Sequence, residues 1–337
     1  MDVKRDVSLP RRINLIFRFS YTLPFFMASV CGSLFAFLFY NPPVHVVILM
    51  PVVVLLLAVF VNFSNDYFDH KSGVDKIRFM DREEMAKALD SELLKKIYWE
   101  GNPFDDGLIN DKQGRYVMAL LLVLAGAFAI PVFLHGGLIV ILFGGMGVFL
   151  SYFYTAPPLD LGARGLGEIN VAVSFFMLVF CSFYVATTDL SGAEIFMFGL
   201  GIFNAEIFIF AMIIGTLVGL MRLTDSMSGQ EAHIMRGEKS ISVRFGLDGA
   251  VKIAKAFIVF GYILFAVMVL FNPLYALLFL TLPLTFKVWK IMSEKSDNWT
   301  MKIPPFFFGT AFMAEIFFVV AVFVIYVFDV QPLISFL

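Results

Sequence analysis

Three carboxylates and two carboxamides lie within fourteen residues, where a long apolar run meets polar sequence. The acids are Asp66, Asp69 and Asp75, and the amides are Asn62 and Asn65. If the chain is still helical here, Asn62, Asp66 and Asp69 share one face, because residues three and four apart are neighbours on a helix. Neighbouring carboxylates repel unless a cation holds them, and hard oxygen ligands suit Mg²⁺ completed by substrate phosphates. The stretch predicts half of a diphosphate-binding site.

A second polar segment, residues 222–248, also places acids beside cations. Its candidate metal ligands and phosphate partners are Asp225, Glu231, Arg222, Lys239 and Arg244. Arginine binds phosphate through two parallel hydrogen bonds, while lysine acts as a point charge. Alone, this segment favours an ordinary charged loop. Combined with the 62–75 stretch on the same membrane face, it favours one joint site.

The elements that must position these residues are membrane helices. The chain has 337 residues, of which 60% are hydrophobic and 15% charged, whereas soluble domains are about half apolar and about a quarter charged. Cys31 and Cys181 both fall in apolar runs, so a disulfide framework is not expected. We expect an all-α, polytopic membrane protein with one domain over residues 1–337, embedded in the lipid bilayer and without a nucleic-acid partner.

Proline, glycine and asparagine divide the apolar runs into spans of roughly 20 residues. Nine transmembrane helices result: two in 19–65, divided at Asn41-Pro42-Pro43; two in 116–159, divided at His135-Gly136-Gly137; a fifth over about 166–188; a sixth ending near Met221; a seventh and eighth divided at Asn272-Pro273; and a ninth over about 304–328. The polar stretches at about 66–115 and 222–248 are then loops that cap the bundle. Gly215 and Gly219 have the spacing typical of close helix contacts.

The positive charges support this division. With nine helices, all 25 Lys and Arg residues fall on one side of the membrane, and the opposite connections hold none. Short cytoplasmic loops carry an excess of Lys and Arg. We therefore expect a multi-pass protein of the cell membrane with a cytoplasmic N-terminus and a cytoplasmic site.

Glu315 falls in the middle of the ninth expected helix. An ionisable group at such depth faces the bundle interior or a wet cavity far more often than lipid. Two interpretations remain open: Glu315 lines the substrate cavity, or it is a neutral carboxyl bonded to a neighbouring helix.

The motifs resemble those of the UbiA-type intramembrane prenyltransferases, in particular the 1,4-dihydroxy-2-naphthoate polyprenyltransferase-like branch. The first motif consists of Asn62 and Asn65-Asp66-Tyr67-x-Asp69, with Asp75 six residues further on, an interval similar to that of the naphthoate branch. Further similar elements are Asn102-Pro103-Phe104, Tyr154-Thr155, Gly165-Leu166-Gly167-Glu168 and the segment from Gly237 to Gly246. The resemblance spans nearly the whole chain.

The second motif departs from the family pattern. The two positions where the family carries aspartates hold Gly229 and His233, while the acids are Asp225 and Glu231. The expected lysine is displaced by one position, to Lys239. Either one helical turn is inserted, which moves Asp225 into place, or the metal shell is altered.

The resemblance implies Mg²⁺-dependent transfer of a polyprenyl group from a polyprenyl diphosphate to an aromatic acceptor, here 1,4-dihydroxy-2-naphthoate in menaquinone biosynthesis. Metal and cations would stabilise the departing diphosphate, and the bundle would keep water from the allylic cation. The implied metal ligands are Asp66, Asp69, Asp75, Asp225 and Glu231. The implied catalytic residues are Asp66, Asp69, Lys239 and Tyr154, and the implied substrate contacts are Asn62, Asn65, Arg164, Arg222, Arg244 and Glu315.

Three alternatives remain. For Tyr154, an interfacial tyrosine is the simpler explanation. A second enzyme hypothesis is geranylgeranyl transfer to an archaeal glycerol-phosphate lipid, or prenyl transfer to another aromatic acid. A hypothesis of another class is a membrane carrier, which the clustering of acids and amides at one membrane face disfavours, because carrier sites more often lie at the bilayer midplane.

Overall fold

The structure, a computed structural model, describes residues 9–73, 102–188, 190, 196–235 and 237–331. Within these residues every regular element is helical, apart from one isolated bridge between Gly137 and Phe198. The α-helices are α1 (Leu9–Phe17), α2 (Phe19–Tyr40), α3 (Val44–Ser72), α7 (Asp111–Gly136), α8 (Leu138–Tyr152), α9 (Gly167–Ala186), α10 (Ala205–Ser228), α11 (Gln230–Met235), α12 (Ile241–Phe271), α13 (Leu282–Glu294), α14 (Trp299–Lys302) and α15 (Pro304–Phe328). A short π-helix, η1 (Gly162–Leu166), precedes α9, and a 3₁₀-helix, η2 (Pro273–Thr281), precedes α13.

The all-α membrane fold predicted from the sequence is confirmed. In the described part of the chain, eight helical segments are long and apolar enough to cross a membrane. The fourth expected helix, α8, has only 15 residues, fewer than the roughly 20 that a bilayer requires. By length and composition, eight helical segments of the described chain are candidate spans, and the predicted count of nine is not confirmed.

The predicted breaks coincide with observed helix ends. Asn41 and Gly137 adopt positive φ angles at the turns after α2 and α7. Asn272 ends α12 and accepts a hydrogen bond from the backbone of Leu274. Helix α7 begins with a reciprocal capping box between Asn110 and Gln113, which satisfies backbone donors that have no partner inside the helix.

Two helices run further than the sequence predicts. Helix α3 continues to Ser72, so the acidic stretch around Asp66 is helical. Helix α10 continues to Ser228, seven residues beyond the expected end at Met221. Arg222 and Asp225 bond to each other along this extension, which stabilises a polar last turn.

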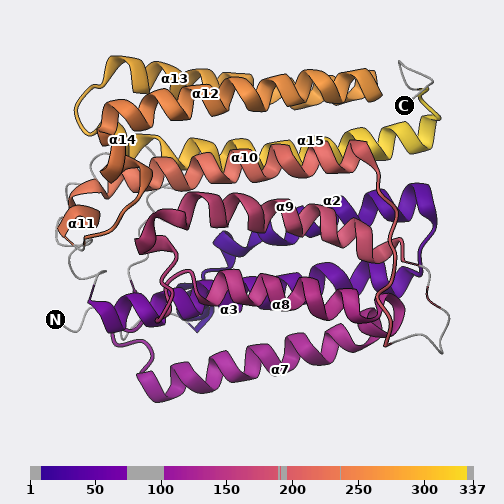
Figure 1. The fold of residues 1–337 in the computed structure, drawn as a ribbon, viewed down its shortest axis with the longest axis horizontal. Helices are drawn as coiled ribbons and strands as arrows, with labels where there is room; N and C mark the ends of the chain where they lie inside the picture. Colours follow the sequence, from indigo (N-terminus) through magenta and orange to yellow (C-terminus); the bar gives the residue numbers. More distant parts are fainter. Residues whose placement is uncertain (1–8, 74–101, 189, 191–195, 236, 332–337) are drawn as a thin grey trace.

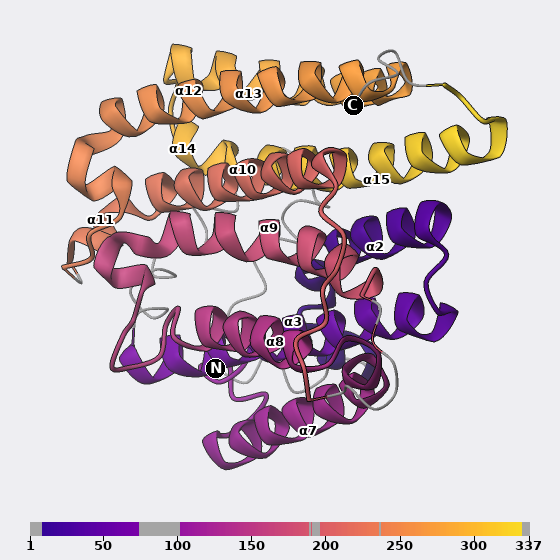
Figure 2. The same ribbon diagram turned by 45° about the vertical axis from the view of Figure 1, so that its right-hand side comes forward.

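The helices pack as a bundle of roughly parallel rods. In both views α12 and α13 lie at one edge and α7 at the other, with α10, α15, α9 and α2 between them (Figures 1 and 2). Helices α9 and α10 approach closely: a Cβ built on Gly215 would lie 2.6 Å from the carbonyl oxygen of Ala172. The predicted close contact at Gly215 is therefore confirmed.

One end of the bundle collects the polar segments. Helices α11 and α14 lie at the left of Figure 1, together with the end of α3 that carries the acidic stretch. The last turn of α15 lies at the opposite end (Figure 1). The two candidate motifs therefore meet at the same end of the molecule.

Candidate active site

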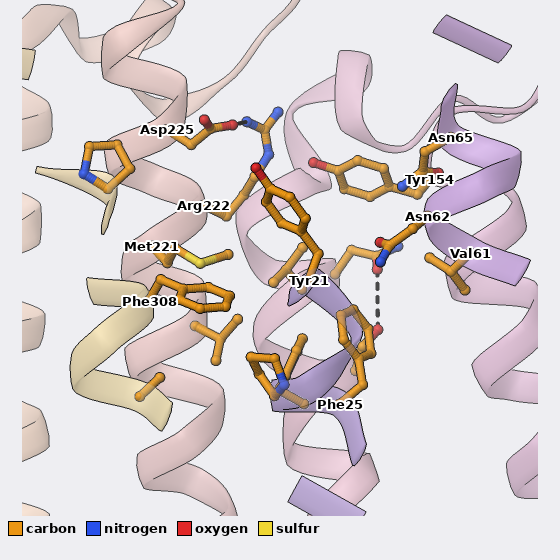
Figure 3. Close-up of a pocket in the computed structure, with 18 of the residues that line it drawn as sticks. Tyr21, Phe25, Val61, Asn62, Asn65, Tyr154, Met221, Arg222, Asp225 and Phe308 are labelled. Atoms are coloured by element: carbon orange, nitrogen blue, oxygen red, sulfur yellow. Dashed lines mark hydrogen bonds and ion pairs between the residues drawn. The ribbon is translucent and has the colours of Figure 1, made fainter. Parts of the chain in front are cut away.

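A cavity of about 300 Å³ opens between α2, α3, α9, α10 and α15 at the polar end of the bundle. Its upper wall carries Asn62, Asn65, Tyr154, Arg222 and Asp225 (Figure 3). Its lower wall is apolar and includes Phe25, Val61, Met221 and Phe308 (Figure 3). The cavity therefore offers a charged rim above an apolar chamber.

Helix α3 supplies one wall. Asn62 and Asn65 line the cavity, whereas Asp66 is buried just outside the lining, with a relative exposure of 4%. The amide of Asn102 donates to the backbone carbonyl of Asp66 at 2.7 Å, and the Thr155 hydroxyl donates to Asn65 Oδ1 at 3.1 Å. Two motifs distant in sequence thus hold the acidic helix in place.

Helix α10 supplies the opposite wall. Arg222 Nη1 lies 2.9 Å from Asp225 Oδ2, and both side chains line the cavity. In Figure 3 they face Asn62 and Asn65 across the cavity. Of the two acids proposed for the second motif, Asp225 is therefore the one that reaches the cavity.

Arg18 is a cavity residue that the sequence analysis did not select. Its Nη2 lies 3.1 Å from Asp66 Oδ1, and it also lines the cavity. It adopts a left-handed conformation (φ 47°) at the junction of α1 and α2. Arg18 is the last cation before the first apolar run, and Asp66 follows the second expected helix, so both had to lie near the same membrane face. This position was the feature of the sequence that could have identified Arg18 as a site residue.

Tyr154 joins the two walls. The guanidinium of Arg222 lies 5.8 Å from the centre of the Tyr154 ring, within range of a cation–π interaction. Burial raises the pKa of the Tyr154 phenol, while the nearby Arg222 charge opposes that rise. The phenol is therefore neutral at physiological pH and can donate a hydrogen bond into the cavity.

Glu168 ties the loops behind the cavity together. It is buried, and its Oε1 accepts from the Ile241 backbone N–H at 3.0 Å and from the Ser226 hydroxyl at 3.4 Å. The sequence analysis recognised Glu168 as part of a motif without assigning it a contact. Its position between α9, α10 and α12 identifies it as a positioning residue.

Gly165 allows two of these loops to meet. It has a φ of 84°, and a Cβ built on it would lie 2.2 Å from the backbone oxygen of Lys239. The Lys239 N–H donates to the carbonyl of Ala163 at 2.8 Å. Any side chain at position 165 would therefore push the two loops apart.

Several predicted site residues lie outside the cavity lining. Arg164 and Arg244 are exposed and donate to the backbone carbonyls of Pro158 and Arg164, at 2.8 and 3.0 Å. The exposed residues Lys239 and Glu231 also lie away from it. Their predicted roles in the reaction remain predictions.

The remaining predicted site residues differ in where they lie relative to the cavity. Asp69 lies one helical turn beyond Asp66 on α3 and is half-buried. Asp75 lies outside the described residues. Glu315 is fully buried in α15, one turn beyond the cavity residue Ala311, and neither carboxyl oxygen has a hydrogen-bond partner in the described part of the chain.

The side-chain oxygens at the cavity fit Mg²⁺ only if a substrate supplies further ligands. Among the described residues, no three His, Cys, Asp or Glu side chains gather closely enough to hold a metal. Mg²⁺ commonly takes one or two carboxylates and completes its shell with phosphates and water. The buried amide nitrogen of Asn62 has no hydrogen-bond partner within the described residues, so this wall retains capacity for a polar ligand.

The fold and the site together define the class of protein: an α-helical membrane bundle with a charged cavity at one end. Residues 23–313 match the UbiA prenyltransferase family, and the chain belongs to this family. This confirms the resemblance noted in the sequence.

Among relatives, the chain is 26% identical over 236 residues to the 1,4-dihydroxy-2-naphthoate octaprenyltransferase of Haemophilus influenzae. The match covers 67% of this chain and 66% of that relative, just under two thirds of its length.

Solved structures share the fold. A UbiA homologue from Archaeoglobus fulgidus bound to DMAPP and Mg²⁺ has a TM-score of 0.63 at 16% identity, covering 94% of this chain and 99% of that one. A structure described for digeranylgeranylglyceryl phosphate synthase has a TM-score of 0.58 at 14% identity, covering 93% and 98%. At these identities the likeness establishes the fold alone.

Proposed function

We propose that this protein transfers a polyprenyl group from a polyprenyl diphosphate to an aromatic acceptor in a Mg²⁺-dependent reaction. One observation carries the proposal: Arg18, which pairs with the buried Asp66 directly behind the lining, and the Arg222–Asp225 pair line one cavity from opposite walls. Arginine suits phosphate oxygens and aspartate suits Mg²⁺. A ligand with a diphosphate head and an apolar chain requires this combination: phosphate and metal ligands at the rim and an apolar chamber below them.

Asp66, Asp225 and Asp69 are the residues that would hold Mg²⁺. When bound, Mg²⁺ would neutralise charge on the departing diphosphate as a Lewis acid. Arg18 and Arg222 would turn from their aspartates to the phosphate oxygens. Asn62 and Tyr154 would donate hydrogen bonds that orient the diphosphate.

In the reaction the bond between the prenyl C1 and the diphosphate oxygen breaks, and its electron pair leaves with the diphosphate. An aromatic carbon of the acceptor then donates an electron pair to C1. That carbon loses a proton, or CO₂ if it carries a carboxylate, and the electrons of the broken bond restore the aromatic ring. Phe25, Phe175 and Phe308 line the apolar part of the cavity and would exclude water from the allylic intermediate.

The name of the Haemophilus influenzae relative supports 1,4-dihydroxy-2-naphthoate as the acceptor, and hence a role in menaquinone biosynthesis. We propose this acceptor first. Another aromatic acid and a glycerol-phosphate lipid are the alternatives that a panel of acceptors distinguishes.

The experiment is a diphosphate-release assay on purified protein with polyprenyl diphosphates, Mg²⁺ and each acceptor in turn. We expect release and a prenylated naphthoate, both lost with EDTA and restored by Mg²⁺. Asp66→Asn should abolish release, while Glu294→Gln, which neutralises an exposed acid of α13, should leave it unchanged. Normal membrane insertion with no release from any donor would indicate a carrier and refute the proposal.

We also propose that the polar end of the bundle faces the cytoplasm and that the protein resides in the cell membrane. The concentration of Lys and Arg at this end supports that orientation. Cysteine introduced at Asp297 should react with an impermeant maleimide only in inside-out vesicles, and cysteine at Gln331 only in right-side-out vesicles. The reverse pattern would overturn the orientation.

A further inference from the structure

A cluster of lysines lies at one edge of the bundle, outside the candidate active site. Helices α12 and α13 form this edge in both views (Figures 1 and 2). From Asp248 to Lys295 the chain carries five lysines and two acids, a net charge of +3. Four of these lysines make up what we call the lysine patch: Lys252 and Lys255 on α12, and Lys287 and Lys290 on α13.

Contacts between the two helices bring the lysine patch together. Lys255 Nζ donates to Ser293 Oγ at 2.8 Å and lies 4.8 Å from the centre of the Trp289 ring. Lys295, directly after α13, forms an ion pair with Asp248 of α12. The end of α13 therefore lies beside the turns of α12 that carry the patch lysines.

Three of the four patch lysines have no carboxylate partner among the described residues. The fourth, Lys290, lies 3.7 Å from Glu294 in a pair whose side chains are 63% and 59% exposed, and such exposed pairs contribute little. Lys287 Nζ lies 4.6 Å from the centre of the Phe306 ring, and Lys252 is exposed. An aromatic ring attracts a cation without neutralising its charge. The lysine patch therefore keeps its positive charge for an external anion.

Beyond the lysine patch, both helices present apolar side chains to their surroundings. On α12, Val259 and Ile263 lie four and eight residues after the second patch lysine and are 50% and 55% exposed. On α13, Phe286 and Leu282 lie four and eight residues before Lys290 and are 69% and 44% exposed. Residues four apart are neighbours on one helix face. Each helix therefore has an outward stripe that is apolar along most of its length and cationic at the polar end of the bundle.

We propose that the lysine patch binds the head group of an anionic phospholipid, whose acyl chains lie along the apolar stripes of α12 and α13. Lysines close to a membrane surface are attracted to anionic lipids. A phosphatidylcholine head group carries its own cation and gains little from the patch, whereas the phosphate of phosphatidylglycerol has no internal counter-charge. A symmetric dimer through this edge is disfavoured, because it would bring two lysine patches together. The proposal is independent of the proposed function.

Tryptophan fluorescence supplies a local probe for the test. The chain has three tryptophans, and Trp99→Phe with Trp299→Phe leaves only Trp289, beside the Lys255 ammonium. The protein is reconstituted into phosphatidylcholine vesicles with a minority of phosphatidylglycerol, and the acyl chains of one lipid or the other carry bromine. A brominated chain quenches an indole that it contacts, so the two preparations report the lipid composition beside the patch.

Four variants are compared in this background. The patch variant removes the three unpaired charges: Lys252→Gln, Lys255→Gln and Lys287→Gln. A milder variant with Lys252→Gln and Lys287→Gln alone keeps the contact between Lys255 and Ser293. A charge-retaining variant has arginine at the same three positions. The matched control removes three exposed cations around the start of α7, at the opposite edge: Lys71→Gln, Lys112→Gln and Arg115→Gln. Thermal unfolding in pure phosphatidylcholine vesicles establishes that each variant is folded.

With the patch intact, we expect phosphatidylglycerol to be enriched beside Trp289 by roughly fivefold over its share of the vesicle, about the effect of one lysine at an anionic surface. High salt should reduce the enrichment, because it screens exposed charges. The patch variant should lose it and the milder variant should lose most of it. The charge-retaining variant should keep it, because arginine also binds phosphate, and the opposite-edge control should keep it as well.

Four results would overturn the proposal. Quenching in proportion to the vesicle composition would show that the patch has no preference for an anionic head group. Enrichment that survives in the folded patch variant, or that falls equally in the opposite-edge control, would separate the preference from these lysines. Quenching by neither brominated lipid would show that another protein chain covers the edge. Loss of the enrichment on addition of inorganic diphosphate would assign the lysines to a soluble anion.

Discussion

Arg18 and Asp66 form an ion pair across the α2–α3 wall of the cavity, with Arg18 Nη2 3.1 Å from Asp66 Oδ1. The carboxylate is buried, and the arginine occupies the position from which a cation would balance it. The same guanidinium suits the diphosphate of a donor. Binding of a Mg²⁺–diphosphate would exchange this internal partner for the ligand.

The first prediction concerns Arg18→Gln. Loss of a charge-assisted hydrogen bond should raise KM for the prenyl diphosphate roughly tenfold to a hundredfold. The Mg²⁺ concentration for half-maximal activity should stay constant or fall, because Asp66 loses its competing partner. Arg12→Gln is the control, since Arg12 donates to the Leu108 carbonyl away from the cavity. A raised Mg²⁺ requirement with an unchanged donor KM would contradict the assignment.

The second prediction concerns the facing pair, Arg222 and Asp225, whose side chains lie 2.9 Å apart. Residues in contact couple energetically, so Arg222→Lys, Asp225→Asn and the double variant should give non-additive losses in kcat/KM. The coupling should amount to about 0.5–3 kcal/mol. Strict additivity in this double-mutant cycle would show that the two side chains act independently during turnover.

The third prediction concerns the pH dependence of Tyr154. Burial raises the pKa of its phenol above the ordinary value of 10.0. A raised pKa means that the neutral form persists to higher pH, so the hydroxyl remains a donor throughout the neutral and mildly alkaline range. Tyr154→Phe should lower kcat without changing the shape of the pH–rate profile below about pH 10. An alkaline limb that disappears in Tyr154→Phe would show that the phenol ionises in the wild type.

The fourth prediction concerns Glu168, which accepts from the Ile241 N–H and the Ser226 hydroxyl. Glu168→Ala leaves these buried donors without an acceptor and should lower the free energy of unfolding by about 1–3 kcal/mol. Thermal unfolding measures this loss. Glu168→Gln keeps an acceptor oxygen and should recover much of the stability, whereas Glu294→Ala should have almost no effect. An equal loss in the Gln and Ala variants would assign the effect to charge.

The fifth prediction concerns Glu315, whose buried carboxyl has no partner among the described residues. Glu315→Met should raise the unfolding free energy by about 1–3 kcal/mol, because an unpaired polar group leaves the apolar core. The same variant tests the predicted substrate contact. A raised KM for the acceptor would show that Glu315 reaches the substrate, and an unchanged KM would assign it to the core alone.

Much of the fold follows from the sequence. Apolar runs broken at Asn41, Gly137 and Asn272 specify helices, because a bilayer leaves no other way to satisfy the backbone. Local signals also predicted that Asn62, Asp66 and Asp69 share one helical face, and the stretch is indeed helical. The sequence did not reveal that α10 extends to Ser228, since a polar turn resembles a loop until its side chains find partners.

What the sequence determined by itself was the class of membrane protein, the breaks between most of its helices and the end of the bundle that carries the polar motifs. What only the tertiary structure decided was the membership of the site: Arg18 entered it, while Arg164, Lys239 and Arg244 lie outside the cavity lining. The physical reason is that periodicity fixes which residues share one helix face, whereas the crossing of separate helices decides which faces meet.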